Sequence, residues 1–131
     1  MSVAFADSFY WLALLHPRDP HHLRVTQLNP PPRLVTSVAV QIEVMDALCG
    51  PAVKGIGRQF WDMSRRTETL EVIPLSEDML ERAVGLFCQR HDKAWSLTDC
   101  ISFTIMSDHG IRRALTGDHH FVQAGFEIAF P

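Results

Sequence analysis

With 131 residues, 47% of them hydrophobic, the chain has the size and composition of one folded domain with a real core, and we expect a single domain over residues 1–131. The formal net charge of −3 argues against a large basic surface, but it does not exclude a polyanionic substrate if a bound cation neutralises part of the acidic charge. The sequence has no apolar run of roughly 18 residues and no basic start followed by an apolar run, so we expect neither a membrane span nor a signal peptide.

Strands and helices are predicted to alternate along the chain. Asp19 before Pro20 predicts a helix start, Gly50 before Pro51 a helix end, and Ser76 a helix cap. In chain order, we predict a strand at 3–6, helices at 8–15 and 19–28, a strand at 33–36, helices at 37–48 and 54–66, a strand at 70–73, helices at 76–90 and 96–109, a strand at 113–116, a helical turn at 119–124 and a strand at 126–129. This alternation indicates an α/β fold with a parallel sheet flanked by helices.

The three cysteines, Cys49, Cys88 and Cys100, bear on the redox environment. Their number is odd, none belongs to a C-x-x-C pair, and each lies in an apolar context. We therefore expect buried, reduced thiols and a cytoplasmic protein.

Four carboxylates lie in or beside apolar stretches: Asp7, Glu43, Asp99 and Asp118. Burying a charge among apolar groups is costly unless the charge is paired or binds a metal. Two of these acids, Asp7 and Asp118, fall just after predicted strands, one lies about two turns into the helix after a strand, and one lies in the first turn of a helix. In a parallel α/β fold all four can converge at the carboxyl ends of the strands, where the functional crevice lies.

Each acid also has a structural interpretation. Asp7 is a candidate N-cap of the following helix, Asp99 forms a potential capping box with Ser96, and Asp118 is a candidate cap of the turn after it. For any one of these three, taken singly, the structural role is favoured. Glu43 lies mid-helix and needs a partner, a metal or a proton-transfer role, and its structural alternative is a salt bridge to an arginine.

Taken together, the four acids favour a shared metal site over four independent caps and bridges. Ligands that are all oxygen select hard cations such as Mg²⁺ or Mn²⁺. Carboxylates around two such ions, about 3.5–4 Å apart, form the arrangement that cleaves phosphodiesters, because one ion activates a water and the other stabilises the leaving oxygen.

The segments around these acids resemble those of a known family. The segments are Ala6-Asp7-Ser8, Thr36-Ser37 leading to Glu43, Ser96-Leu97-Thr98-Asp99-Cys100, and Leu115-Thr116-Gly117-Asp118-His119-His120-Phe121. Their order and spacing resemble the PIN-domain ribonucleases, in particular the VapC-like toxins of bacterial toxin–antitoxin pairs. The resemblance covers essentially the whole chain, and its last two blocks are the most specific.

This resemblance implies a three-layer α/β/α fold with a central parallel sheet of four to five short strands, and Mg²⁺- or Mn²⁺-dependent endoribonuclease activity. It also implies a homodimer and an antitoxin protein that covers or enters the acidic site. The residues that it assigns are Asp7, Glu43, Asp99 and Asp118 as metal ligands and catalytic acids, Thr116 as a hydroxyl that orients a metal-bound water, and Asp92 as a candidate fifth acid at the rim. One departure is Phe9, where the family often has Ser or Asn, which puts a polar contact to the first acid in doubt.

Basic residues and histidines are less informative. Lys54, Arg58, Arg65 and Arg66 lie on one predicted helix, which is usually a solvated face, and they are weak candidates for contacts to an RNA backbone. The histidines include the adjacent pairs His21-His22 and His119-His120, and neighbours on a helix point away from each other. We expect most of them at the surface, with His120 packing beside the acidic site.

Two other functions fit part of this sequence. The first is a catalytically weak PIN-like module that binds RNA or a protein partner. The second is a receiver-like phosphoacceptor domain, which fits poorly because such a site needs paired acids at the first strand, and only Asp7 is there.

Overall fold

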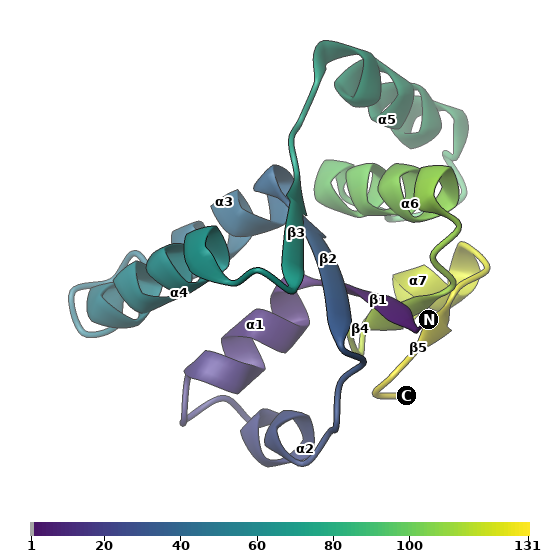
Figure 1. Cartoon of the computed structure of the whole chain (residues 1–131). Coiled ribbons are helices and arrows are strands. Elements are labelled where there is room, and N and C mark those ends of the chain that lie inside the picture. The colour runs from purple at the N-terminus through teal and green to yellow at the C-terminus, as the bar shows by residue number, and fades with distance from the viewer. Residues whose placement is uncertain (1) are drawn as a thin grey trace.

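The computed structural model describes residues 2–131, and one five-stranded sheet forms its centre (Figure 1). The strand order is β3-β2-β1-β4-β5, and all neighbouring strands run parallel. The strands are β1 (Val3–Ala6), β2 (Arg33–Ser37), β3 (Leu70–Ile73), β4 (Arg113–Leu115) and β5 (Glu127–Ile128). The predicted α/β class, with a parallel sheet of four to five short strands, is confirmed.

Helices cover both faces of this sheet. The helices are α1 (Ser8–Leu15), α2 (His22–Thr26), α3 (Val38–Ala47), α4 (Lys54–Arg66), α5 (Glu77–Gln89), α6 (Leu97–His109) and α7 (His119–Gln123). In Figure 1, α1, α3 and α4 gather on one side of the sheet, and α5, α6 and α7 gather on the other. The expected three-layer α/β/α architecture is therefore confirmed.

The strand order places a switch point at the middle of the sheet. From β1 the chain adds β2 and then β3 on one side, whereas β4 and β5 lie on the other. In parallel sheets, ligands bind beyond the carboxyl ends of the strands where the order reverses. Asp7 directly follows β1, and Thr116 directly follows β4, so both lie at this position.

The central strand is covered by core on both faces. Ala4, Phe5 and Ala6 of β1 are all buried, as expected for a parallel strand between two helical layers. Other large side chains that are fully buried come from α4, α6, β4 and α7: Phe60, Ile105, Met106, Leu115 and Phe121. The core therefore holds β1 and β4 rigidly beneath the acids that follow them.

Side-chain caps define several helix starts. The hydroxyl oxygens of Ser37, Ser76 and Ser96 each accept a hydrogen bond from the amide three residues later, at 3.1, 3.1 and 3.0 Å. Gly110 ends α6 with a φ of 64°, a left-handed conformation that glycine adopts without strain. The ends of these helices agree closely with the boundaries predicted from sequence.

Two sequence-based expectations were wrong. The second helix begins at His22 rather than after Asp19, because the Asp19 carboxylate accepts a hydrogen bond from the His21 amide and forms a turn first. Cys49 and Cys88 are exposed, and only Cys100 is buried, since an apolar neighbour in sequence does not decide which way a side chain points. Among the described helices, none is both long and apolar enough to cross a membrane.

Candidate active site

Asp7 is the most deeply buried of the four acids. It follows β1 directly, and its side chain is closed off by the core around the strand. Asp7 occupies the N-cap position of α1 but makes no side-chain capping hydrogen bond, so the capping interpretation does not explain it. Instead, the Thr116 hydroxyl donates to Asp7 Oδ2 at 3.0 Å.

Burial raises the pKa of Asp7 to about 7. Loss of hydration is the largest cause, and the charges of Glu43 and Asp99 add to it. The Ser8 amide and the Thr116 hydroxyl favour the charged form and offset only part of this rise. A buried carboxyl with two acidic neighbours is an environment that a bound cation would stabilise.

Thr116 connects Asp7 to Asp118. The Thr116 hydroxyl donates to Asp7, and its oxygen accepts a hydrogen bond from the Asp118 amide at 3.1 Å. Between them lies Gly117, where an added Cβ would lie 2.8 Å from the ring of Phe9 and 3.1 Å from the carbonyl oxygen of Phe130. Glycine at this position therefore lets the loop after β4 approach α1 closely and brings Asp118 toward Asp7.

Asp99 has two contacts at once. Its Oδ2 accepts a hydrogen bond from the Ser96 amide at 3.1 Å, which confirms the capping box predicted from sequence. The same oxygen lies 3.0 Å from Nδ1 of His120. Capping fixes the carboxylate at the start of α6, and it leaves Oδ1 free of that role, so the structural and functional interpretations of Asp99 are compatible.

Asp118 also acts as a cap and as a neighbour of His120. Its Oδ1 accepts a hydrogen bond from the His120 amide at 2.9 Å, so the predicted cap of α7 is confirmed. The same oxygen lies 3.5 Å from Nδ1 of His120. Asp99, Asp118 and His120 each offer one ligand atom, and these three atoms lie within 4.8 Å of one another.

Glu43 joins the group through α1. It is half-buried on α3, and the Ser8 hydroxyl donates to its Oε1. The alternative of a salt bridge to arginine is wrong, because no ion pair of residues 2–131 includes Glu43. The charge of Glu43 acts on the adjacent Asp7, which places the two acids in one electrostatic environment.

The four acids therefore form one connected group. It runs from Glu43 through Ser8 and Asp7 to Thr116, and from there through Asp118 and His120 to Asp99. The acids come from α3, the end of β1, the start of α6 and the loop after β4. Within residues 2–131, no lysine or arginine forms an ion pair with any of the four. Carboxylate oxygens that pair with no lysine or arginine suit a divalent cation.

His120 is the residue at this site that sequence reasoning undervalued. It was expected only to pack beside the acids, yet its ring nitrogen lies between two of them. The available signal was the Asp-x-His spacing at the start of α7. When the aspartate caps the helix, the residue two positions later is held within reach of the capping carboxylate.

Comparisons with known proteins find relatives of this chain in sequence and in fold. No family model matches the chain. The "23S rRNA-specific endonuclease VapC20" of Mycobacterium tuberculosis is 28% identical over 127 residues, which cover 93% of this chain and 94% of that protein. The crystal structure of Mycobacterium tuberculosis VapC20, described as a sarcin-ricin loop cleaving toxin, matches with a TM-score of 0.88 and 26% identity, over 95% of this chain and 96% of that one.

The chain is VapC-like. A toxin–antitoxin complex from Klebsiella pneumoniae has the same fold, with a TM-score of 0.64 and 20% identity over 96% of this chain and 95% of that one. So does VapBC2 from Rickettsia felis bound to a DNA fragment of its promoter, with a TM-score of 0.68 and 11% identity over 97% of both chains.

In this VapC-like chain, Asp92 has a different partner from the one expected. Its two carboxylate oxygens accept hydrogen bonds from Arg90 at 3.0 and 3.1 Å, and Lys93 lies 3.9 Å away. The guanidinium of Arg90 lowers the pKa of Asp92 to about 2. Asp92 is exposed, and no hydrogen bond or ion pair of the described chain links it to the four acids, so the structure does not place it in their group.

Phe9 of the VapC-like chain packs against two other rings and close to Gly117. Its ring lies 4.7 Å from that of His21 and 5.9 Å from that of Phe130, measured between centroids. The polar contact to Asp7 is supplied by Thr116 instead. Asp7 therefore has a side-chain hydrogen-bond donor even though Phe9 stands where the family often has Ser or Asn.

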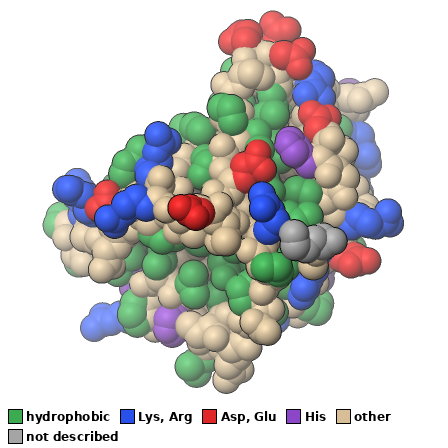
Figure 2. Space-filling view, in the orientation of Figure 1, with side chains coloured by type: hydrophobic (Ala, Val, Ile, Leu, Met, Phe, Trp, Pro, Cys, Tyr) green, Lys and Arg blue, Asp and Glu red, His purple; other side chains and the backbone are tan. Residues whose placement is uncertain are grey.

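The basic residues of α4 form a surface apart from the core. Lys54, Arg58, Arg65 and Arg66 are all exposed, and Lys and Arg side chains gather over α4 at the left of Figure 2. Arg58 pairs with Asp62 at 3.4 Å, and the guanidinium carbon of Arg65 lies 5.2 Å from the centre of the Trp61 ring. These side chains are accessible to a ligand in solution.

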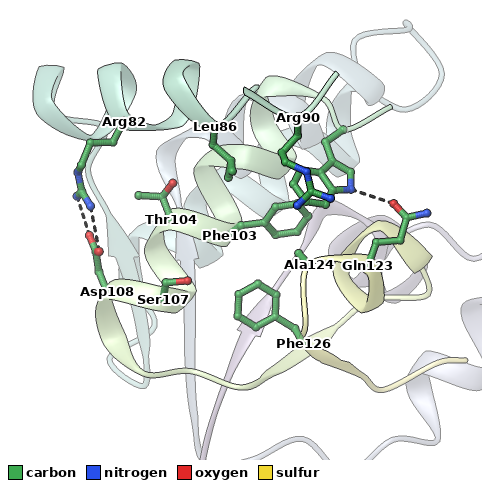
Figure 3. Close-up of a pocket in the computed structure, with 11 residues that line it drawn as sticks. Arg82, Leu86, Arg90, Phe103, Thr104, Ser107, Asp108, Gln123, Ala124 and Phe126 are labelled. Atoms are coloured by element: carbon green, nitrogen blue, oxygen red, sulfur yellow. Dashed lines mark hydrogen bonds and ion pairs between the residues drawn. The ribbon is translucent and has the colours of Figure 1, made fainter. Parts of the chain in front are cut away.

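A pocket of about 360 Å³ lies elsewhere, between α5, α6 and α7 (Figure 3). Leu86, Phe103 and Phe126 point into it, and the Arg82–Asp108 ion pair borders one side. None of the four acids lines this pocket. The candidate active site of the VapC-like chain is therefore the acidic group at the carboxyl ends of β1 and β4 and not this pocket.

Proposed function

We propose that the chain is a divalent-metal-dependent endoribonuclease and the toxin of a toxin–antitoxin pair. The observation that carries this proposal is the connected group of Asp7, Glu43, Asp99 and Asp118, none of which pairs with a lysine or arginine of residues 2–131. Its support from relatives is the similarity to VapC20, an endonuclease specific for 23S rRNA. By this analogy the substrate is RNA, and we propose hydrolysis of its phosphodiester bonds.

The four acids are the residues that we propose to hold Mg²⁺ or Mn²⁺. Their oxygen donors fit either ion, and the uncompensated burial of Asp7 is the structural sign that a positive charge belongs there. When bound, such an ion supplies a water of lowered pKa and stabilises the charge on the leaving oxygen.

The chain's own residues would then orient the reaction. The Thr116 hydroxyl donates a hydrogen bond to Asp7 Oδ2 and accepts one from the Asp118 amide, so it fixes these two acids relative to each other. We propose that this hydroxyl also positions the attacking water. The Ser8 hydroxyl donates to the Glu43 carboxylate, which ties this acid to the residue that follows Asp7. Preorganised groups of this kind lower the barrier because they need no reorganisation during the reaction.

The proposed partners follow from the same analogy. RNA would contact the exposed Lys54, Arg58, Arg65 and Arg66 through its phosphates, which is a sequence-independent contribution to binding. Several structural neighbours are toxin–antitoxin complexes, and we propose an antitoxin protein as a partner of this chain. We also propose a homodimer and a cytoplasmic location.

Cleavage by an Asp99→Asn variant tests the proposed activity. An amide is nearly isosteric with a carboxylate and can still accept the Ser96 hydrogen bond, so the variant should fold. We expect it to lose cleavage of an RNA oligonucleotide in Mn²⁺ or Mg²⁺. Asp92→Asn is the matched control, because it makes the same chemical change on an exposed acid that pairs with Arg90.

The two variants separate the interpretations. Loss of cleavage in Asp99→Asn with full activity in Asp92→Asn supports a role for Asp99 at the metal site. Cleavage that survives in Asp99→Asn means that Asp99 only caps α6. If the wild-type chain binds RNA but cleaves none, the catalytically weak binding module is the better description.

Growth assays test the toxin assignment separately. We expect expression of the wild-type chain alone to arrest growth, and co-expression of a small protein encoded by a neighbouring gene to restore it. The Asp99→Asn variant should not arrest growth. Normal growth with the wild-type chain argues against the toxin assignment and leaves the nuclease assignment to the cleavage assay.

A further inference from the structure

His120, the second residue of α7, lies close to two acids of the site. Asp118 is the N-cap of α7, and Asp99 lies in the first turn of α6. Helix α7 lies beside α6 (Figure 1), and Nδ1 of His120 lies 3.0 Å from Asp99 Oδ2 and 3.5 Å from Asp118 Oδ1. The ring is about one-third exposed, with 32% of its side chain accessible. A nitrogen donor therefore lies close to oxygen donors of two acids, Asp99 and Asp118.

Local structure fixes this ring in place. The His120 amide donates to Asp118 Oδ1 at 2.9 Å, so the backbone of His120 is tied to the same carboxylate that its ring approaches. Asp99 is held in turn by the Ser96 amide. Both neighbours of the ring are thus positioned by helix caps, and the nitrogen and the two oxygens are arranged before any ligand binds.

The separations match those of ligands that share one ion. Two neighbouring donors at about 2.1 Å from an octahedral metal lie about 3.0 Å apart. The distance of 3.0 Å from Nδ1 to Asp99 Oδ2 corresponds to this value, and the 3.5 Å to Asp118 Oδ1 exceeds it by a shift that a side chain can make. Donors at such separations can bind the same cation without rearrangement of the backbone.

A nitrogen donor changes which cation is preferred. Mg²⁺ binds proteins through oxygen and keeps much of its water, whereas imidazole is a common ligand of transition ions. We propose that His120 Nδ1 is a direct ligand in this site, together with Asp99 and Asp118, and that it makes the site select Mn²⁺ over Mg²⁺. This inference rests on the proposed metal-dependent function and specifies its cofactor.

The competing interpretation is that His120 only orients Asp99 by donating a hydrogen bond. Both interpretations predict that a His120→Asn variant has weaker metal binding. They differ in selectivity, because a lost hydrogen bond to Asp99 affects every cation that Asp99 binds, whereas a lost nitrogen ligand affects Mn²⁺ far more than Mg²⁺.

Metal binding by the purified full chain provides the test, with Mn²⁺ and Mg²⁺ as the probes. Free Mn²⁺ is measured by electron paramagnetic resonance, and Mg²⁺ affinity is measured by competition. We expect His120→Asn to weaken Mn²⁺ binding by about 10-fold or more while Mg²⁺ affinity changes far less. His119→Asn is the matched control, because His119 is an exposed histidine on the same turn and lies outside the group.

A spectroscopic measurement gives a direct readout of the ligand. Spin-echo modulation of the bound Mn²⁺ should show coupling to a ¹⁴N nucleus in wild type and in His119→Asn, and this coupling should disappear in His120→Asn. Absence of the coupling in wild type, equal losses for both cations, or no binding of Mn²⁺ by wild type overturns the proposal.

The outcome is independent of the cleavage assay. Nitrogen coupling in a chain that cleaves no RNA supports the His120 ligand and refutes the nuclease assignment. Cleavage of RNA by a chain without nitrogen coupling supports the nuclease and overturns the role of His120.

Discussion

Removal of the Asp7 charge should stabilise the metal-free protein at neutral and higher pH. Burial raises the pKa of Asp7 from 3.8 to about 7. A carboxyl with a raised pKa in the folded state binds its proton more tightly there than in the unfolded chain. The free energy of unfolding therefore falls as pH rises between these two values, because the unfolded chain ionises first.

The size of the effect follows from the shift. Each pH unit within this window costs about 1.4 kcal/mol, so the wild-type protein should lose roughly 2–3 kcal/mol of stability between about pH 5 and about pH 8 through Asp7 alone. Asp7→Asn has no charge to bury, and its amide oxygen can still accept the Thr116 hydrogen bond. The variant should lack this part of the pH dependence and be more stable than wild type at the higher pH.

Urea unfolding in the presence of a chelator, at the two pH values, measures this difference. Asp99→Asn is a useful comparison, because the charge of Asp99 is a minor cause of the raised pKa of Asp7. Its removal should lower that pKa by only a small part of the full shift, so most of the pH dependence should remain. Saturating Mn²⁺ should reverse the order and make wild type the more stable protein, since the variant loses a ligand. The same pH dependence in wild type and in Asp7→Asn would refute the claim that Asp7 is an uncompensated buried acid.

Three further results are expected. Millimolar Mn²⁺ should raise the melting temperature of the wild-type chain, because a free ion at 100 times its Kd raises the free energy of unfolding by about 2.7 kcal/mol. An unchanged melting temperature favours the binding-module alternative. Gly117→Ala should lower the free energy of unfolding by about 1–3 kcal/mol, because its Cβ would lie 2.8 Å from Phe9 and 3.1 Å from the Phe130 carbonyl oxygen, and a urea midpoint equal to that of wild type contradicts this close packing. Changing Arg65 and Arg66 together to Gln should weaken RNA binding and reduce the slope of log K against log salt by about 1.4, while an unaltered slope removes α4 from the RNA surface.

The sequence predicted the local structure of this protein closely. Helix α4, with the bounds Lys54–Arg66, and strand β3, with the bounds Leu70–Ile73, agree with the predicted ranges. The capping box of Ser96 and Asp99 was also predicted and is present. These features depend on residues within a few positions of one another, so periodicity and cap chemistry suffice to define them.

The residues of the candidate site were harder to place because their surroundings come from distant segments. Asp92 was a candidate rim acid on account of its position before Asp99, but Arg90 binds it. His120 was assigned to packing, and it lies 3.0 Å from Asp99, 21 residues earlier in the chain. The partner of Asp92 is local, two residues earlier in the chain, whereas the contact of His120 with Asp99 depends on how α7 packs beside α6.

The sequence by itself determined the order of strands and helices, the helix caps at Ser76, Ser96 and Asp118, and the four acids that stand out among apolar residues. The tertiary structure decided how those acids are held. Thr116 donates to Asp7 across 109 residues of chain only because β1 and β4 are adjacent and in register. The raised pKa of Asp7 likewise requires the core to close around it and Glu43 and Asp99 to lie near it. Local propensities reside in short segments, whereas the electrostatics of a buried site depend on which distant segments pack together.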